Sequence, residues 1–174
     1  MDRALFIGRF QPFHHGHMFA IKKLLKKYNE VVVVLGSSED SYSAENPFTC
    51  GERLEMMRLC FTRSELGRII MVPVPDVNDN RIWVDHVFMH IPAIDDVYSN
   101  NQLVKMLFSK HGILVKTIEF FDRGPKEGNH IRRLIADGDR SWTKHVPPKA
   151  VAFLDAVDGE QRIKKIVRMG ARHV

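Results

Sequence analysis

The chain has 174 residues, of which 44% are hydrophobic and 27% are charged, the usual balance of a folded globular protein. This composition excludes collagen-like and low-complexity proteins, and no stretch is apolar for long enough to span a membrane. The N-terminus lacks the long apolar stretch of a signal peptide, so we expect one cytoplasmic domain over residues 1–174.

The net charge of +5 and the isoelectric point near 9.3 raise the question of nucleic-acid binding. Residues 162–174 carry five of the 26 basic residues and no acidic residue. The other 161 residues carry 21 basic and 21 acidic groups, so their net charge is zero. Because the excess belongs to one terminal segment, we expect it to form a solvated helix face or to contact a neighbouring subunit, and we expect no nucleic-acid partner.

Short apolar runs alternate with segments of helical spacing along most of the chain. Strands are expected at residues 4–7, 31–35, 69–74, 96–99 and 115–120. Helices are expected to start near residue 17, near 50 and near 84, and to cover 102–110, 131–136, a region opened by residues 147 and 148, and 160–169. This order predicts an α/β fold, with a Rossmann-like, doubly wound sheet of about five parallel strands, flanking helices and a helical C-terminal part over about 128–174.

Two of these helices have sequence signals at their ends. Thr49 is followed three residues later by Glu52, and this spacing predicts a capping box at a helix N-terminus. Arg53 is expected to project from the first turn of that helix. The stripe expected to be buried consists of Leu54, Met57 and Phe61. Gly112 is expected to end the helix at 102–110.

The ten residues from Gly8 to His17, GRFQPFHHGH, lie between the first predicted strand and the first predicted helix. An open α/β sheet binds its ligands in such a turn. Glycines at 8 and 16 allow close approach of the backbone, and Arg9, His14 and His17 are donors beside a helix N-terminus that favours anions. The pattern is neither the three-glycine dinucleotide fingerprint nor the Gly-rich loop that ends in Lys-Ser or Lys-Thr. It predicts a loop that binds phosphate groups.

Other chemically active side chains give weaker patterns. His86 and His90 lie four residues apart on a predicted helix, a spacing that some zinc sites use, but no acidic or cysteine ligand completes the set. Cys50 and Cys60 have neither a metal-binding nor a redox spacing, and no His–Asp arrangement accompanies them. We therefore expect no metal site formed by the protein and no covalent nucleophile.

The motif His-x-Gly-His, preceded by Gly-Arg-Phe-x-Pro-Phe, resembles the signature of the nucleotidyltransferase superfamily. Four further segments, NPFTCGERLEMM, PVPDVNDNRIWV, VYSNNQLVKMLF and VPPKAVAFLDAVDG, are similar to the archaeal-type nicotinamide-nucleotide adenylyltransferases, and the resemblance covers almost the whole chain. It implies transfer of the AMP moiety of ATP to nicotinamide mononucleotide, which forms NAD and pyrophosphate with the help of Mg²⁺. It also implies a homo-oligomer, often a hexamer.

The resemblance assigns roles to residues of this chain. It places His14, His17 and Arg9 at the ATP phosphates and Arg132 at the β- and γ-phosphates, and these four form the implied catalytic set. The implied ATP site comprises Gly8, Arg9, Phe10, His14, Gly16, His17, Asn129 and Arg132. The implied site for the acceptor nucleotide comprises Arg53, Asp76, Asn80 and Trp83. The Mg²⁺ ion would be held by phosphates rather than by the protein.

One motif departs from the family pattern. Where the family has Ser-x-Thr-x-x-Arg at the start of a helix, this chain has Glu127 and Asn129 before Arg132. Asn129 can still cap a helix, whereas the Glu127 carboxylate would repel a triphosphate unless it turns away or meets Mg²⁺ or Lys126. Two alternatives therefore stay open: an adenylyltransferase for another phosphate acceptor, such as nicotinate mononucleotide or phosphopantetheine, and a nucleotide-binding regulator with weakened catalysis.

Overall fold

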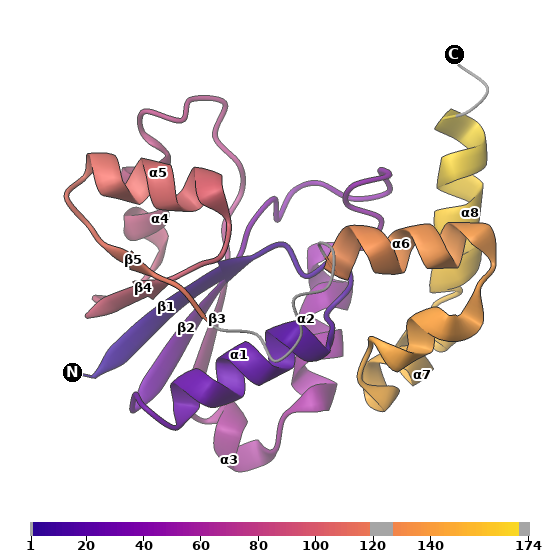
Figure 1. Cartoon of the computed structure of the whole chain (residues 1–174), viewed down its shortest axis with the longest axis horizontal. Coiled ribbons are helices and arrows are strands. Elements are labelled where there is room, and N and C mark those ends of the chain that lie inside the picture. Colours follow the sequence, from indigo (N-terminus) through magenta and orange to yellow (C-terminus); the bar gives the residue numbers. More distant parts are fainter. Residues whose placement is uncertain (1, 119–126, 171–174) are drawn as a thin grey trace. The chain divides into compact units, whose positions relative to one another are not determined.

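The computed structural model describes residues 2–118 and 127–170 (Figure 1). The chain divides into two compact units, and each is described by itself. The first unit consists of Met1–Gly8, Phe19–Glu39 and Arg63–Phe120. The second consists of Arg9–Met18, Asp40–Thr62 and Phe121–Val174. The expectation of a single domain stays a prediction.

The first unit contains a sheet of five parallel strands in the order β3-β2-β1-β4-β5. The strands are β1 (Arg3–Gly8), β2 (Glu30–Leu35), β3 (Ile69–Pro73), β4 (Asp96–Tyr98) and β5 (Val115–Lys116). The α/β prediction with a doubly wound sheet is thus confirmed. The strand order reverses at β1, which pairs with β2 on one side and with β4 on the other. The motif over residues 8–17, called the phosphate-loop motif after its predicted ligand, begins at the last residue of β1. It therefore leaves the sheet at the point where such folds bind ligands.

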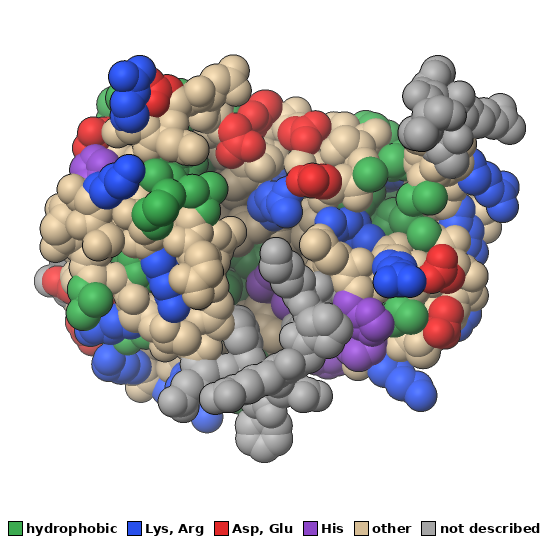
Figure 2. Space-filling model, turned by 45° about the horizontal axis from the view of Figure 1, so that its top comes forward, with side chains coloured by type: hydrophobic (Ala, Val, Ile, Leu, Met, Phe, Trp, Pro, Cys, Tyr) green, Lys and Arg blue, Asp and Glu red, His purple; other side chains and the backbone are tan. Residues whose placement is uncertain are grey.

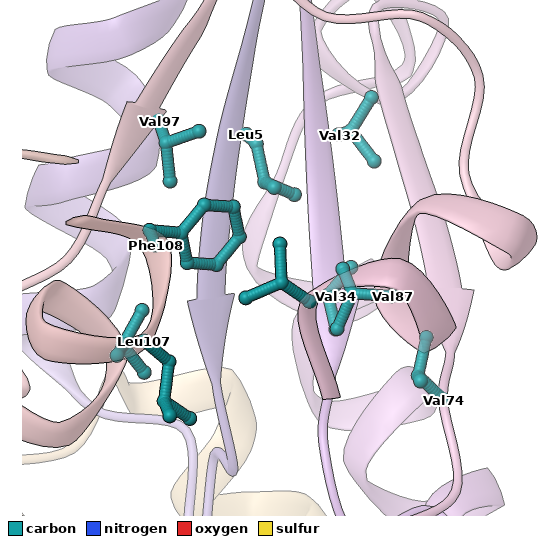
Figure 3. Packing of buried hydrophobic residues seen from close by; sticks show 10 residues of the cluster. Leu5, Val32, Val34, Val74, Val87, Val97, Leu107 and Phe108 are labelled. Atoms are coloured by element: carbon teal, nitrogen blue, oxygen red, sulfur yellow. The ribbon is translucent and has the colours of Figure 1, made fainter. Parts of the chain in front are cut away.

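Apolar side chains of the strands form the core of the first unit together with two helices, α4 (Trp83–His90) and α5 (Gln102–Lys110). Figure 3 shows Leu5, Val32, Val34 and Val97 packed with Val87 of α4 and with Leu107 and Phe108 of α5. The residues that alternate with them along the strands, Ala4, Phe6, Val31 and Val33, are buried as well. Strands buried on both faces explain why residues 31–35 form an apolar run without alternation.

The helix ends of the first unit follow the sequence signals with small shifts. Helix α1 (His15–Leu25) begins two residues before the expected start, and α3 (Arg63–Leu66) is a single turn that the sequence analysis did not predict. Gly112 has a φ of +72°, which favours glycine, and α5 ends just before it as expected. The strand predicted over 115–120 is shorter in the structure, because β5 ends at Lys116, and residues 119–120 lie outside the described residues.

The second unit contains the helices α2 (Cys50–Cys60), α6 (Glu127–Asp137), η1 (Arg140–Lys144, a 3₁₀ helix), α7 (Pro148–Ala156) and α8 (Gly159–Gly170). Helix α2 packs against α7, and α6 packs against α8. Helix α6 begins four residues earlier than predicted, and η1 was not predicted. None of the helices in the described ranges is both long and apolar enough to cross a membrane.

The capping box of α2 is confirmed, but the buried face of this helix differs from the prediction. Thr49 accepts a hydrogen bond from the Glu52 N–H, and the Glu52 side chain accepts one from the Thr49 N–H. Leu54, which was predicted to be buried, is only half-buried, whereas Arg53 is fully buried. From the first turn of α2, the Arg53 side chain reaches the Arg9 carbonyl oxygen in the interior of the second unit. Its guanidinium satisfies backbone carbonyl groups inside the unit, which makes burial of this charge possible.

The basic C-terminal segment is not simply a solvated helix face. Arg162 of α8 donates two hydrogen bonds to Glu52, at 2.6 and 2.7 Å, and both side chains are only 16% exposed. Lys164 pairs with Glu160 within the same helix at 3.7 Å. Basic and acidic side chains also lie interspersed on the face of the molecule drawn in Figure 2. Part of the terminal charge is thus neutralised within the second unit.

Candidate functional site

Residues 9–17 of the phosphate-loop motif lie in the second unit and are well packed, whereas Gly8 ends β1 of the first unit. Phe10 and Phe13 are almost completely buried, and Phe10 has a φ of +56°, an unusual value for a residue other than glycine. The buried Gln11 donates from Nε2 to the Phe48 carbonyl oxygen at 2.8 Å and accepts from the Phe48 N–H at 2.9 Å. This paired bond fixes the loop against the segment before α2. Such fixation is typical of loops that must hold donors in place for a ligand.

Sequence reasoning did not identify Gln11 as part of the site. Its partner, Phe48, is 37 residues away, so no local spacing links the two. The one available signal was an uncharged polar residue between Phe10 and Pro12, inside a turn that is otherwise apolar. A polar side chain in such a place needs a hydrogen-bond partner when it is buried.

The two histidines of the motif lie directly against each other. The ring centroids of His14 and His17 are 3.5 Å apart, and the ring planes are inclined by 23°. The backbone N–H of His17 donates to Nδ1 of His14 at 3.4 Å. Because this bond occupies Nδ1, Nε2 is the ring nitrogen of His14 that remains to donate to a ligand oxygen.

His17 also packs against two phenylalanine rings. Its ring centroid lies 4.7 Å from that of Phe10 and 5.8 Å from that of Phe13. Burial, and secondarily the neighbouring His14, hold the pKa of His17 well below its ordinary value of 6.5. His17 is therefore neutral at physiological pH.

Arg132 of α6 joins the loop from a distant part of the sequence. Its guanidinium donates to the Gln11 carbonyl oxygen at 2.7 Å, to Asn129 Oδ1 at 2.6 Å and to the Ala44 carbonyl oxygen at 3.1 Å. Burial, and secondarily the charge of Arg9, lower the pKa of Arg132, and Glu45 opposes this effect. The structure thus brings Arg132 and Asn129 together with the motif that carries His14 and His17.

Of two further arginines, Arg9 belongs to the loop and Arg53 contacts its backbone. Arg9 forms an ion pair with Glu45, with 2.9 Å between Nη1 and Oε2. Arg53 donates from Nη1 to the Arg9 carbonyl oxygen at 2.9 Å and from Nε to the Thr49 carbonyl oxygen at 3.4 Å. Arg53 thus supports the backbone of the phosphate loop. Its assignment to the acceptor nucleotide stays a prediction.

The other residues assigned to the acceptor lie in the first unit. Asp76 and Asn80 are exposed, in the segment between β3 and α4. Trp83 is half-buried, packs against the core cluster and makes an edge-to-face contact with Phe108, with 6.0 Å between ring centroids. The Asp76 N–H donates to both carboxylate oxygens of Glu39 at 3.0 Å, which fixes the start of this segment.

The described residues contain no group of three or more His, Cys, Asp and Glu side chains that could hold a metal ion. His86 and His90 instead make protein contacts: His86 Nε2 lies 3.0 Å from the Pro75 carbonyl oxygen, and His90 Nδ1 lies 2.7 Å from the His86 carbonyl oxygen. The side chain of Glu127, the departure from the family motif, lies outside the described residues.

Comparison with known proteins identifies relatives along nearly the whole chain. The cytidylyltransferase-like family model matches residues 5–135. The nicotinamide-nucleotide adenylyltransferase of Caldivirga maquilingensis is 39% identical over 169 residues, which cover 96% of this chain and 95% of the relative. The enzyme of the same name from Archaeoglobus fulgidus is 38% identical over 169 residues, which cover 94% of this chain and 97% of the relative.

Solved structures share the fold at lower identity. The bifunctional NMN adenylyltransferase/ADP ribose pyrophosphatase of Francisella tularensis has a TM-score of 0.75 and 20% identity, and the match covers 98% of this chain. The chain spans 54% of that protein. A second structure of the bifunctional protein, complexed with AMP and a manganese ion, has a TM-score of 0.74 and 22% identity. Together with the archaeal relatives, the family match shows that this chain belongs to the cytidylyltransferase-like family and, within it, to the nicotinamide-nucleotide adenylyltransferases.

Proposed function

We propose that this chain transfers the adenylyl group of ATP to nicotinamide mononucleotide and releases pyrophosphate, forming NAD. The observation that carries this proposal is that one fixed loop in the second unit carries Arg9 and the paired His14 and His17 and binds Arg132 through the Gln11 carbonyl oxygen. Neutral imidazoles and guanidinium groups are donors suited to phosphate oxygens. The identity of 38–39% to full-length nicotinamide-nucleotide adenylyltransferases supports the choice of acceptor.

The reaction needs little from the protein beyond binding and charge stabilisation. An oxygen of the mononucleotide phosphate attacks the α-phosphorus of ATP, and the bond from that phosphorus to the bridging oxygen of the β-phosphate breaks. Pyrophosphate leaves with the electron pair of that bond. Because the attacking phosphate is already anionic at neutral pH, no general base is required. Positioning of the two phosphates and stabilisation of the departing pyrophosphate then account for catalysis.

The geometry suggests a role for each donor. His14 and His17 would donate hydrogen bonds to phosphate oxygens, and Arg9 and Arg132 would bind the triphosphate. Arg132 is already oriented by its bonds to Gln11 and Asn129, so little side-chain entropy remains to be lost when phosphate binds. No covalent intermediate with the enzyme is part of this mechanism.

The side chains at the loop also indicate how a Mg²⁺ ion would be held. The side chains proposed to bind the triphosphate are guanidinium and imidazole groups, which suit phosphate oxygens, whereas Mg²⁺ prefers oxygen ligands. The residues therefore fit a Mg²⁺ ion that is held by the phosphates of ATP, and the role of this chain is to hold those phosphates. A bound Mg²⁺ would neutralise part of the charge of the triphosphate.

The acceptor nucleotide would contact residues of the first unit. Asp76, Asn80 and Trp83 would bind a flat pyridine ring and its amide, and Arg53 would act near the phosphate loop. Adenylyl transfer to nicotinate mononucleotide or phosphopantetheine and a regulator that binds without turnover are the competing possibilities. The homo-oligomer and the cytoplasmic location stay predictions.

The test is an assay of NAD formation and pyrophosphate release from ATP and nicotinamide mononucleotide with Mg²⁺. Parallel reactions contain nicotinate mononucleotide or phosphopantetheine as the acceptor. We expect NAD and pyrophosphate in equal amounts. If no acceptor reacts although ATP or NAD raises the melting temperature, the chain is a nucleotide-binding regulator and the proposed activity is refuted.

A further inference from the structure

Two arginines that the proposed function assigns to the triphosphate contact the same short turn. Arg9 pairs with the Glu45 carboxylate at 2.9 Å, and Arg132 donates from Nε to the carbonyl oxygen of Ala44 at 3.1 Å. Ala44 and Glu45 are the two central residues of this turn, which runs from residue 43 to residue 46. Both residues and both arginines belong to the second unit. One turn therefore supplies an oxygen acceptor to each of the two cations.

The base of the turn is fixed independently of these contacts. The Ser43 N–H donates to the Asn46 carbonyl oxygen at 3.2 Å, and the Asn46 N–H donates to Ser43 Oγ at 3.0 Å. The buried Asn46 side chain also donates to Asp40 at 2.6 Å. Because these bonds do not involve the Glu45 side chain, the carboxylate can leave Arg9 while the turn stays folded.

The charges at the site explain why an anion is needed there. Arg9 lowers the pKa of Arg132 and Glu45 raises it, so the three charged groups interact with one another. Two neighbouring guanidinium groups repel each other, and this repulsion falls when a negative charge lies between or beside them. The exposed fractions of 45% for the Arg9 side chain and 76% for the Glu45 side chain leave this ion pair accessible to a ligand.

We propose that Glu45 is an internal anion that neutralises Arg9 in the nucleotide-free protein and is displaced when a polyphosphate binds. This inference rests on the proposed function for the assignment of Arg9 and Arg132 to phosphate. A carboxylate that competes for Arg9 weakens the binding of every polyphosphate, whether it is the triphosphate of the substrate or the released pyrophosphate. Glu45 thereby limits retention of the product.

The expected effect is modest, because ion pairs between exposed side chains contribute little. Removal of the competing charge by Glu45→Gln should tighten polyphosphate binding about two- to fivefold at low salt. The gain should shrink as ionic strength rises, since exposed charges are screened. It should also require Arg9, so Glu45→Gln should have no effect in an Arg9→Ala background.

The experiment is calorimetric titration of the full chain with inorganic tripolyphosphate, pyrophosphate or orthophosphate. The control variant is Glu55→Gln, which changes the net charge equally at an exposed position of α2 in the same unit. Tighter binding of tripolyphosphate and pyrophosphate by Glu45→Gln, with wild-type affinity in Glu55→Gln, would support the proposal. An unchanged or weaker affinity in Glu45→Gln, or an equal gain in Glu55→Gln, would overturn it.

ATP and AMP serve as further ligands, because ATP carries a chain of phosphates and AMP carries a single phosphate group. Glu45→Gln should tighten binding of ATP more than binding of AMP, because the competition concerns a chain of phosphates. An equal gain for AMP would contradict displacement by a polyphosphate. Titration with inorganic tripolyphosphate tests the role of Glu45 whether or not the protein transfers an adenylyl group. A wild-type protein that forms no NAD would refute the proposed function and leave the result for Glu45 unaffected.

Discussion

Replacement of Arg162 by methionine should destabilise the protein substantially, although this residue belongs to the basic terminal segment. Arg162 makes two charge-assisted hydrogen bonds to Glu52, and its guanidinium lies 4.9 Å from the Tyr42 ring centroid and 5.8 Å from that of Phe48. Methionine keeps much of the apolar contact but removes both bonds. The Glu52 carboxylate would then keep only its capping contacts with Thr49.

The size of the effect lies between two limits. Breaking a fully buried ion pair costs about 3–5 kcal/mol, and breaking an exposed one costs about 0–1 kcal/mol. With both side chains 16% exposed, we expect Arg162→Met to lower the free energy of unfolding by about 2–3 kcal/mol. For a chain of this size this loss corresponds to a fall of about 1–1.5 M in the urea midpoint.

Urea denaturation of Arg162→Met, Glu52→Gln and the double variant forms the assay. In Glu52→Gln the amide oxygen would still accept the capping bond, so this variant removes the ion pair and keeps the cap. The double-mutant cycle of Arg162 and Glu52 should then give a coupling energy of about 1–2 kcal/mol. A coupling energy near zero would refute the reasoning. Burial alone would raise the pKa of Glu52, but hydrogen bonds from Arg162 and Thr49 outweigh it and lower that pKa. The stabilisation should therefore be present above the ordinary glutamate pKa of about 4.3 and be lost as pH falls below it.

Three further predictions concern the candidate site. His17→Ala should lower turnover about 10²- to 10³-fold by removing a phosphate donor, while the fold is retained in circular dichroism; unchanged turnover would remove His17 from the mechanism. Because the pKa of His17 is held below 6.5 in the folded state, the unfolded chain takes up the proton first, and stability should fall below about pH 6.5 by at most about 1.4 kcal/mol per pH unit. Between pH 7.5 and 5.5, the urea midpoint should change less with pH in His17→Ala than in the wild type. An equal change in both proteins would assign the pH dependence to other groups. Trp83→Ala should raise the KM for nicotinamide mononucleotide and leave that for ATP unchanged, whereas an equal rise of both would indicate damage to the core.

Local signals in the sequence predicted most of the fold correctly. The Thr49–Glu52 capping box depends on bonds between residues three positions apart, so the sequence spacing alone could reveal it. The helix at 102–110 has the bounds that its apolar spacing and Gly112 indicate. The buried run at 31–35 fits a strand that is covered on both faces. In each case the stabilising contacts are local or depend only on periodicity.

Contacts between distant segments could not be predicted in the same way. Arg53 was expected to project from the first turn of its helix, but its partner could not be predicted: Nη1 donates to the Arg9 carbonyl oxygen, 44 residues earlier in the chain. The pair of Arg162 and Glu52 spans 110 residues, and that of Arg9 and Glu45 spans 36. Charged side chains have the same local pattern whether they are solvated or paired, so only the tertiary structure distinguishes these cases.

The link between Arg162 and Glu52 affects how the C-terminus can be modified in the laboratory. Removal of the chain after residue 161, an obvious way to test whether the basic segment binds polynucleotides, would also remove the partner of the α2 cap. Any loss of function in the shortened protein would then have two possible causes. Charge reversal at Lys165 and Arg168, which are exposed on α8, leaves the pair intact and tests the electrostatic question alone. Purification tags fused at the C-terminus are best attached through a flexible linker, so that the turn of α8 that holds Arg162 stays helical.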